Sequence, residues 1–235
     1  MNLVIHDIQK KFDKKEVLKG ASFTFEKGKI YGLLGRNGAG KTTLFNCINE
    51  DIPADGGTFQ IEENGTCRPI LSEDIGYVLS TPVVPEFLTG REFLKFFLDI
   101  NREKMKEVHT IDQYFDFMRI DPEDRDRLIK DYSHGMKNKM QMLVNFIANP
   151  SILLLDEPLT SFDIVVADEM KQLLRQMKTD HIIILSTHIM ELALNLCDKI
   201  VILSDGVLEE IRKTNLDNDE FEDKIIAALR GDGSD

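Results

Sequence analysis

The sequence has no apolar run that approaches the roughly 18–20 residues of a membrane span. Its three cysteines, Cys47, Cys67 and Cys197, and its five histidines show no ligand spacing, which argues against a structural zinc. The odd number of cysteines favours reduced thiols in the cytosol. Residues 1–11 mix charged with apolar side chains, unlike a signal peptide. We therefore expect a cytoplasmic protein that does not insert directly into a membrane.

Positive charge is in short supply. With 29 Lys and Arg against 41 Asp and Glu, the formal net charge of the 235-residue chain is −12. A chain this acidic is repelled by nucleic acid and by anionic lipid surfaces, so no nucleic-acid partner is expected. The length suits one full core with room for an inserted subdomain.

Residues 35–42 read Gly-Arg-Asn-Gly-Ala-Gly-Lys-Thr. This run fits the phosphate-loop pattern of a Gly, four residues, then Gly-Lys and Ser or Thr. The apolar stretch 29–34 before it suits a buried strand, and residues 43–49 can form a helix. A strand, a glycine-rich loop and a helix in this order distinguish a phosphate loop from a surface turn. The sequence therefore predicts a nucleotide-binding α/β core.

The residue types of this loop indicate how it would hold phosphate. Its glycines let the backbone curl so that amides point at phosphate oxygens, and the helix adds the positive end of its dipole. Lys41 is expected to reach the β- and γ-phosphates, and the Thr42 hydroxyl to ligate Mg²⁺. The predicted contacts are Gly35, Arg36, Asn37, Gly38, Ala39, Gly40, Lys41, Thr42 and Thr43.

A second apolar run, residues 151–155, ends in two carboxylates, Asp156 and Glu157. Such a run suits a strand buried on both faces of a parallel sheet. Asp156 at its end can hold Mg²⁺, and Glu157 can orient a water at the γ-phosphate as a general base. The ordinary alternative, a strand that ends in a solvated acidic turn, loses weight beside the phosphate loop.

Two further segments carry weaker signals. Ser133 and Gly135 precede an apolar face of helical period and so lie at a helix N-terminus, which can bind an anion; from local sequence alone an ordinary N-cap is the preferred interpretation. His188 follows a buried-strand pattern at 182–185 and is a candidate γ-phosphate ligand, although a lone His is more often without such a role.

In their order and spacing, these motifs resemble the ATP-binding subunit of an ATP-binding cassette (ABC) transporter over residues 3–208. Residues 133–136 resemble the signature variant seen where the membrane subunits are separate exporters of the ABC-2 type. The resemblance implies that Phe12 stacks on adenine, that Val17 also contacts the nucleotide, and that Asp163 touches the opposite subunit. It leaves ATP as the expected nucleotide, with Mg²⁺.

The resemblance also implies the architecture. The fold class is α/β: a phosphate-loop NTPase core of mixed, mainly parallel sheet flanked by helices, with an N-terminal antiparallel β subdomain. The core would comprise 1–84 and 137–210, and a helical subdomain 85–136. Thr89 and Glu92 have capping-box spacing there, and Asp121-Pro122 predicts another helix start. Residues 211–235 form an acidic helix and tail expected to dock on the core.

Members of this family work as pairs. The resemblance implies that two subunits meet head to tail, each ATP lying between the phosphate loop of one and the signature of the other. Glu157, His188 and Lys41 would be catalytic, and the partners would be a second nucleotide-binding subunit and separate membrane permeases. The chain would then lie on the inner face of the cell membrane. Cargo, export against import, and identical against different subunits stay open.

Three departures from the family pattern stand out. The position that normally carries a Gln ligand for Mg²⁺ is Ser80, or Thr81 if the register slips by one, and the shorter side chain predicts weaker metal positioning. His134 replaces a common Gly, which predicts pH-dependent activity. Residues 159–163 read Leu-Thr-Ser-Phe-Asp rather than the more frequent Thr-Ser-Gly-Leu-Asp.

Two other classes fit less well. A soluble ABC-type ATPase of DNA repair, chromosomes or translation would bring long coiled coils or a second cassette, and this chain has neither. A small-molecule kinase on a phosphate-loop fold would not need the signature or a Glu after Asp156.

Overall fold

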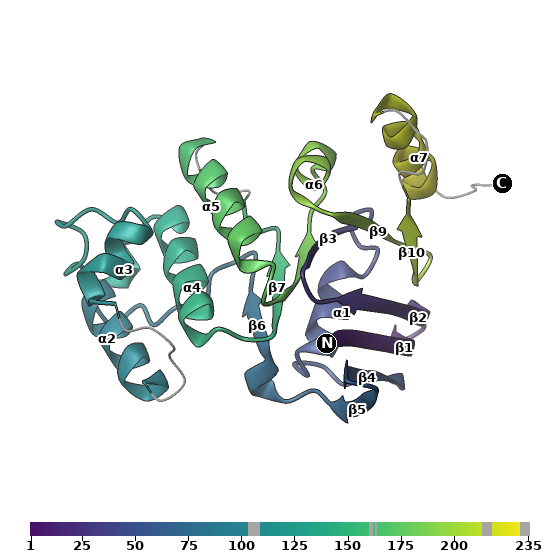
Figure 1. The fold of residues 1–235 in the computed structure, drawn as a ribbon, viewed down its shortest axis with the longest axis horizontal. Coiled ribbons are helices and arrows are strands. Elements are labelled where there is room, and N and C mark those ends of the chain that lie inside the picture. The colour runs from purple at the N-terminus through teal and green to yellow at the C-terminus, as the bar shows by residue number, and fades with distance from the viewer. Residues whose placement is uncertain (103–108, 160–161, 163, 213–217, 231–235) are drawn as a thin grey trace.

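The structure is a computed structural model and describes residues 1–102, 109–159, 162, 164–212 and 218–230. Two sheets form its centre (Figure 1). The four-stranded antiparallel sheet has the order β2-β1-β4-β5, and the six-stranded sheet has the order β10-β9-β3-β8-β7-β6. The second sheet is parallel except for β10, which pairs antiparallel to β9. This α/β architecture confirms the predicted fold class.

The strands are β1 (Asn2–Phe12), β2 (Lys15–Glu26), β3 (Lys29–Leu34), β4 (Gly56–Glu63), β5 (Thr66–Pro69), β6 (Ile75–Val78), β7 (Ile152–Asp156), β8 (Ile182–Ser186), β9 (Lys199–Ser204) and β10 (Val207–Ile211). The helices are α1 (Lys41–Ile48), α2 (Gly90–Asn101), α3 (Ile111–Phe117), α4 (His134–Ala148), α5 (Ile164–Met177), α6 (Met190–Leu196) and α7 (Asn218–Arg230), with short 3-10 turns at Ser72–Asp74 and Ile129–Asp131.

The central strands β7 and β8 are apolar up to their last residues, Asp156 and Ser186, as suits strands whose two faces are both covered. Alternate side chains of a strand point to opposite faces. In β7, Leu153 and Leu155 pack into the cluster that includes the buried side of α4 and α5, whereas Ile152 and Leu154 pack with α1 and the antiparallel sheet. The parallel sheet is thus a middle layer, and its strands cannot show the alternation of a half-exposed strand.

Helices α2, α3 and α4 lie together at the end of the molecule opposite α7 (Figure 1). Thr89 caps α2, and its capping box with Glu92 is formed as predicted. The helix expected from Pro122 is absent, and i→i+3 turns from Asp121 and Asp124 take its place. Arg125 explains the difference: its buried guanidinium donates to the carbonyl of Ile120 at 3.1 Å and reaches the carboxylates of α3, which pulls the turn inward.

Helix α7 docks on the parallel sheet through an apolar face, as its helical spacing predicted. Phe221 and Ile225 are 5% and 0% exposed and pack with Ile200 and Ile202 of β9. Within the described residues, no helix is long and apolar enough to cross a membrane.

Candidate functional site

The phosphate loop joins the end of β3 to the start of α1, with Gly40 as the helix N-cap. Gly40 has φ 107°, a conformation that side chains disfavour. A Cβ there would also lie 2.7 Å from Cγ1 of Val17, so the glycine lets β2 approach the loop closely. The buried Lys41 ammonium donates to the carbonyl oxygens of Gly35 and Arg36 at 2.8 and 3.3 Å. The lysine is therefore held inside the loop rather than extended into solvent.

The surroundings of Lys41 also tune its charge. Burial lowers the pKa of the Lys41 ammonium, and the carboxylates of Glu157 and Asp156 oppose that shift. A buried ammonium gains from an anionic ligand, because the ligand compensates for the lost hydration. The loop is thus electrostatically suited to phosphate.

Asp156, at the end of β7, is 3% exposed and takes part in two hydroxyl hydrogen bonds. The Thr42 hydroxyl donates to its Oδ2 at 2.8 Å, and the Ser186 hydroxyl at the end of β8 donates to its Oδ1. Hydrogen bonds to a charged group are worth about 1.5–3 kcal/mol each, which fixes this carboxylate. The Thr42 hydroxyl and the Asp156 carboxylate therefore lie side by side as two hard oxygen atoms that could ligate a metal ion.

Glu157 turns away from β7 through a left-handed backbone conformation, φ 51°. Its amide donates to the carbonyl of Ser186 at 3.1 Å, which holds the turn in place. Nδ1 of His188 then lies 2.9 Å from Oε1 of Glu157. Strained backbone of this kind concentrates at functional sites, and here it brings together two residues predicted from separate strand ends.

Lys41, Thr42, Asp156 and Glu157 share one cavity of about 530 Å³, between the β1–β2 hairpin, the phosphate loop and the end of β7. It is lined by Phe12, Lys15, Val17, Asn37, Gly38, Gly40, Lys41, Thr42, Thr43, Ser80, Asp156 and Glu157. Ser80 rather than Thr81 is therefore the loop residue at the site. The Phe12 ring is 47% exposed at the mouth, where an adenine could stack.

Some predicted residues lie beside this cavity. Gly35 and Arg36 line a neighbouring hollow with His188, and Ala39 lines a further one beside the β9–β10 turn. Lys15 is a lining residue that the sequence analysis missed. Its only signal was its place three residues after Phe12, across the β1–β2 turn.

The signature residues stand apart from the cavity. Ser133 is the N-cap of α4, where its exposed hydroxyl accepts from the amide of Met136 at 3.2 Å. His134 is exposed, Gly135 is half-buried, and neither these two nor Ser133 line the cavity. Asp163 lies outside the described residues. In one chain the cavity therefore lacks a signature wall.

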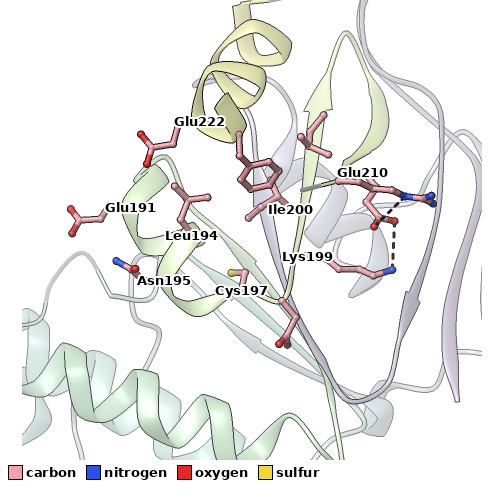
Figure 2. A pocket seen from close by; sticks show the side chains of 12 residues that line it. Glu191, Leu194, Asn195, Cys197, Lys199, Ile200, Glu210 and Glu222 are labelled. Atoms are coloured by element: carbon pink, nitrogen blue, oxygen red, sulfur yellow. Dashed lines mark ion pairs between the residues drawn. The ribbon is translucent and has the colours of Figure 1, made fainter. Parts of the chain in front are cut away.

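Another hollow, of about 580 Å³, lies between α6, β9, β10 and α7. Figure 2 shows Leu194, Cys197 and Ile200 beside an ion pair of Lys199 with Glu210, at 3.5 Å. Burial raises the pKa of the Cys197 thiol to about 12, so the thiol stays protonated. Acidic side chains such as Glu191 and Glu222 line this hollow, and it includes no phosphate-loop residue. Lys199 and Arg212 also line the hollow, so its charge is mixed and it lacks the glycine loop of a phosphate site.

A glycine loop between a strand and a helix, with a hydroxyl and a carboxylate beside its lysine, defines a phosphate-loop nucleotide-binding protein. Comparison with known families narrows that class. The family model described as ABC transporter matches residues 18–160, more than half of the chain. The chain belongs to the ABC transporter family and is an ATPase of that family.

Individual relatives agree. The chain is 34% identical to an uncharacterized ABC transporter ATP-binding protein of Methanocaldococcus jannaschii, over 86% of this chain and 74% of that protein. It is 33% identical to Nod factor export ATP-binding protein I of a Rhizobium species, over 85% of this chain and 66% of that protein. It is also 36% identical to human ATP-binding cassette sub-family A member 6, of which it spans only 13%.

Solved structures show the same fold. An ATP-binding subunit of an ABC transporter superposes with a TM-score of 0.77 at 25% identity, covering 98% of this chain and 95% of that one. A dimeric ATP-binding cassette with bound ADP and Pi has a TM-score of 0.73 at 19% identity, covering 90% and 100% of the two chains. The resemblance expected from the sequence is confirmed.

Proposed function

We propose that this chain binds Mg-ATP, pairs head to tail with a second nucleotide-binding subunit around two ATP molecules, and drives export through separate membrane subunits. The observation that carries the proposal is the asymmetry of the site. Lys41, Asp156 and Glu157 converge on one cavity, whereas Ser133 lies outside it. A chain built in this way has half of each of two sites.

The donors around Asp156 suit Mg²⁺. Its carboxylate and the Thr42 hydroxyl are hard oxygen ligands, and Ser80 adds a hydroxyl on the same cavity. Among the described residues no three His, Cys, Asp or Glu side chains cluster to form a metal cage. This fits Mg²⁺, which is commonly held by one or two carboxylates together with substrate phosphates and water. When bound, the ion supplies positive charge against the β- and γ-phosphates.

We assign to Glu157 the role of orienting the attacking water. It lines the cavity, and the turn at φ 51° separates its carboxylate from that of Asp156, so the two groups serve different ligands. His188 holds the Glu157 carboxylate at 2.9 Å and its side chain is 52% exposed, so it can also reach the γ-phosphate of the ATP bound to its own phosphate loop. Lys41 exchanges its loop carbonyls for phosphate oxygens.

The N-terminus of α4 supplies the missing wall to the other subunit. Its helix dipole favours negative charge, and the exposed Ser133 hydroxyl adds a donor. Closure by a second copy would remove water from the γ-phosphate and complete the charge clamp. We take that closure as the work-producing step and product release as the reopening step.

Exposed apolar side chains near α2 fit a membrane subunit. Four aromatic side chains of α2 and α3 belong to the hydrophobic core between the sheet and α4 or pack against it: Phe93, Phe97, Tyr114 and Phe115. In contrast, Phe87 is 79% and Phe96 58% exposed, and Val83 and Ile100 are exposed with them. Phe96 and Ile100 lie four residues apart on α2 and so share one face of that helix, which we assign to a protein interface. It would hold the chain on the inner face of the membrane through its partner.

The experiment that tests the proposal is light scattering of Glu157→Gln with and without Mg-ATP. The substitution should keep ATP binding and remove the base, so a closed pair accumulates. We expect a dimer only with Mg-ATP, and a monomer again in the double variant with Ser133→Arg. A monomer that has demonstrably bound ATP, or a dimer that Ser133→Arg leaves intact, contradicts the proposed arrangement.

A further inference from the structure

Gln141, in the middle of α4, is a buried polar side chain that no part of the mechanism above uses. It is 4% exposed. Its Oε1 accepts from the amide of Val83 at 2.7 Å, and its Nε2 donates to the carbonyl of Leu79 at 3.2 Å. One carboxamide thus holds both ends of the five-residue segment 79–83.

This segment carries Ser80, which lines the same cavity as Thr42 and Asp156. Pro82, also within it, has no amide hydrogen to donate. A loop has no neighbouring strand to bond its backbone. A carboxamide can supply both the acceptor and the donor that such a strand would offer. The two Gln141 hydrogen bonds therefore restrict where the backbone of Ser80 can lie.

The helix that carries Gln141 is itself fixed on the neighbouring strand. Asn145, one turn further on, donates to the carbonyl of Gln141 at 2.8 Å and to that of Tyr77 in β6 at 3.5 Å. A Cβ at Gly76 would lie 2.7 Å from Oδ1 of Asn145, so this glycine permits the close packing of α4 on β6. Gln141 thus belongs to a helix that packs closely on β6 and is hydrogen-bonded to it.

We propose that Gln141 is a positioning residue, which holds Ser80 at the metal side of the nucleotide site and ties it to the helix that begins at the signature. The inference rests on the proposed function, in which Ser80 ligates Mg²⁺. Ser133 and Gln141 are eight residues apart on one helix, about 12 Å along its axis. A displacement of α4 on dimer closure is then transmitted to the Ser80 loop.

The test measures binding rather than turnover, in the Glu157→Gln background where ATP persists. The dissociation constant of ATP is determined with EDTA and with Mg²⁺ for Gln141→Leu and for Gln141→Glu, which keeps the acceptor for Val83. Loss of an outer-shell partner typically costs 10–100-fold in metal affinity. We expect the tightening by Mg²⁺ to fall about tenfold in Gln141→Leu, with binding in EDTA unchanged, and to fall less in Gln141→Glu.

Two controls separate positioning from general loss of structure. Met170→Ala in α5 empties a buried site of the same core cluster without touching segment 79–83, so it should lower thermal stability but leave the Mg²⁺ effect intact. Hydrogen exchange of the Val83 amide in the nucleotide-free protein should accelerate in Gln141→Leu and stay slow in Gln141→Glu. If the Val83 amide exchanges at the wild-type rate in Gln141→Leu, the clamp does not exist.

A double-mutant cycle with Ser80→Ala decides whether Gln141 acts through Ser80. If it does, adding Gln141→Leu to Ser80→Ala lowers the Mg²⁺ effect no further, and additive losses overturn the inference. If Ser80→Ala weakens Mg²⁺ binding while Gln141→Leu does not, the positioning role alone fails. If Ser80→Ala has no effect, the metal role of Ser80 in the proposed function has failed, and the inference is overturned with it.

Discussion

The end of the parallel sheet and the N-terminus of α4 carry the residues that we assign to one reaction, yet they differ in how they are held. At the sheet end, Asp156 is buried and receives two hydroxyl hydrogen bonds. At the start of α4, Ser133 is exposed, and its hydroxyl is engaged with its own helix. The hydrogen bonds that fix the first region all lie within one chain, whereas the second region forms only a helix cap.

The difference follows from where each region gets its support. Strands β3, β7 and β8 are neighbours in one sheet, so side chains at their carboxyl ends meet without any other chain. The start of α4 faces solvent, where no described residue holds Ser133 against a ligand. Substitutions at the sheet end should therefore act on chemistry within one subunit, and those at α4 on what happens between two subunits.

The largest effect that separates the two regions is expected at Glu157. Replacement by Gln removes the group that orients water but keeps its size, so kcat should fall by about 10²–10⁴. ATP binding, measured by a fluorescent analogue, should stay at the wild-type level because Lys41 and Thr42 are untouched. A variant that retains more than a tenth of the wild-type rate would remove Glu157 from the role of base.

A smaller effect is expected from Ser80→Gln. The Ser hydroxyl is about two bonds shorter than a Gln amide, so the longer side chain should hold the metal better and raise kcat, by roughly up to tenfold. Steady-state rates at several Mg²⁺ concentrations measure it, with Thr81→Gln as the matched control one residue along. An unchanged kcat would show that Ser80 does not limit turnover.

The sequence predicted best what local physics decides. All-apolar runs gave the buried strands β7 and β8, and glycine spacing with Lys41 gave the phosphate loop. The apolar face of helical period expected after Gly135 is the buried face of α4, where Met140 and Leu143 are both buried. These features depend on neighbours in the chain, which periodicity and motif spacing report directly.

What the sequence could not show depends on contacts between distant segments. In a helical pattern Gln141 is a polar residue suited to solvent, and only the position of segment 79–83 makes it buried and bonded. Asp121-Pro122 is a sequence typical of a helix start, but the buried Arg125 donates to the carbonyl of Ile120 and the segment forms turns instead. Lys15 enters the site because a hairpin brings β2 to the phosphate loop. These contacts join segments far apart in the chain, and no residue spacing in the sequence indicates them.

The smallest predicted change compares two helix caps and tests the contrast most directly. Ser133 caps α4 and Thr89 caps α2, each accepting from an amide three residues on, at 3.2 and 3.1 Å. Replacing either by Ala should lower the free energy of unfolding by about 1 kcal/mol, measured by urea denaturation. Only Ser133→Ala should also slow ATP hydrolysis, because in the proposed pair the Ser133 hydroxyl faces the second subunit's nucleotide, whereas that of Thr89 serves its helix alone. Equal ATPase rates in the two variants would show that Ser133 only caps its helix. The N-terminus of α4 would then have no part in ATP hydrolysis.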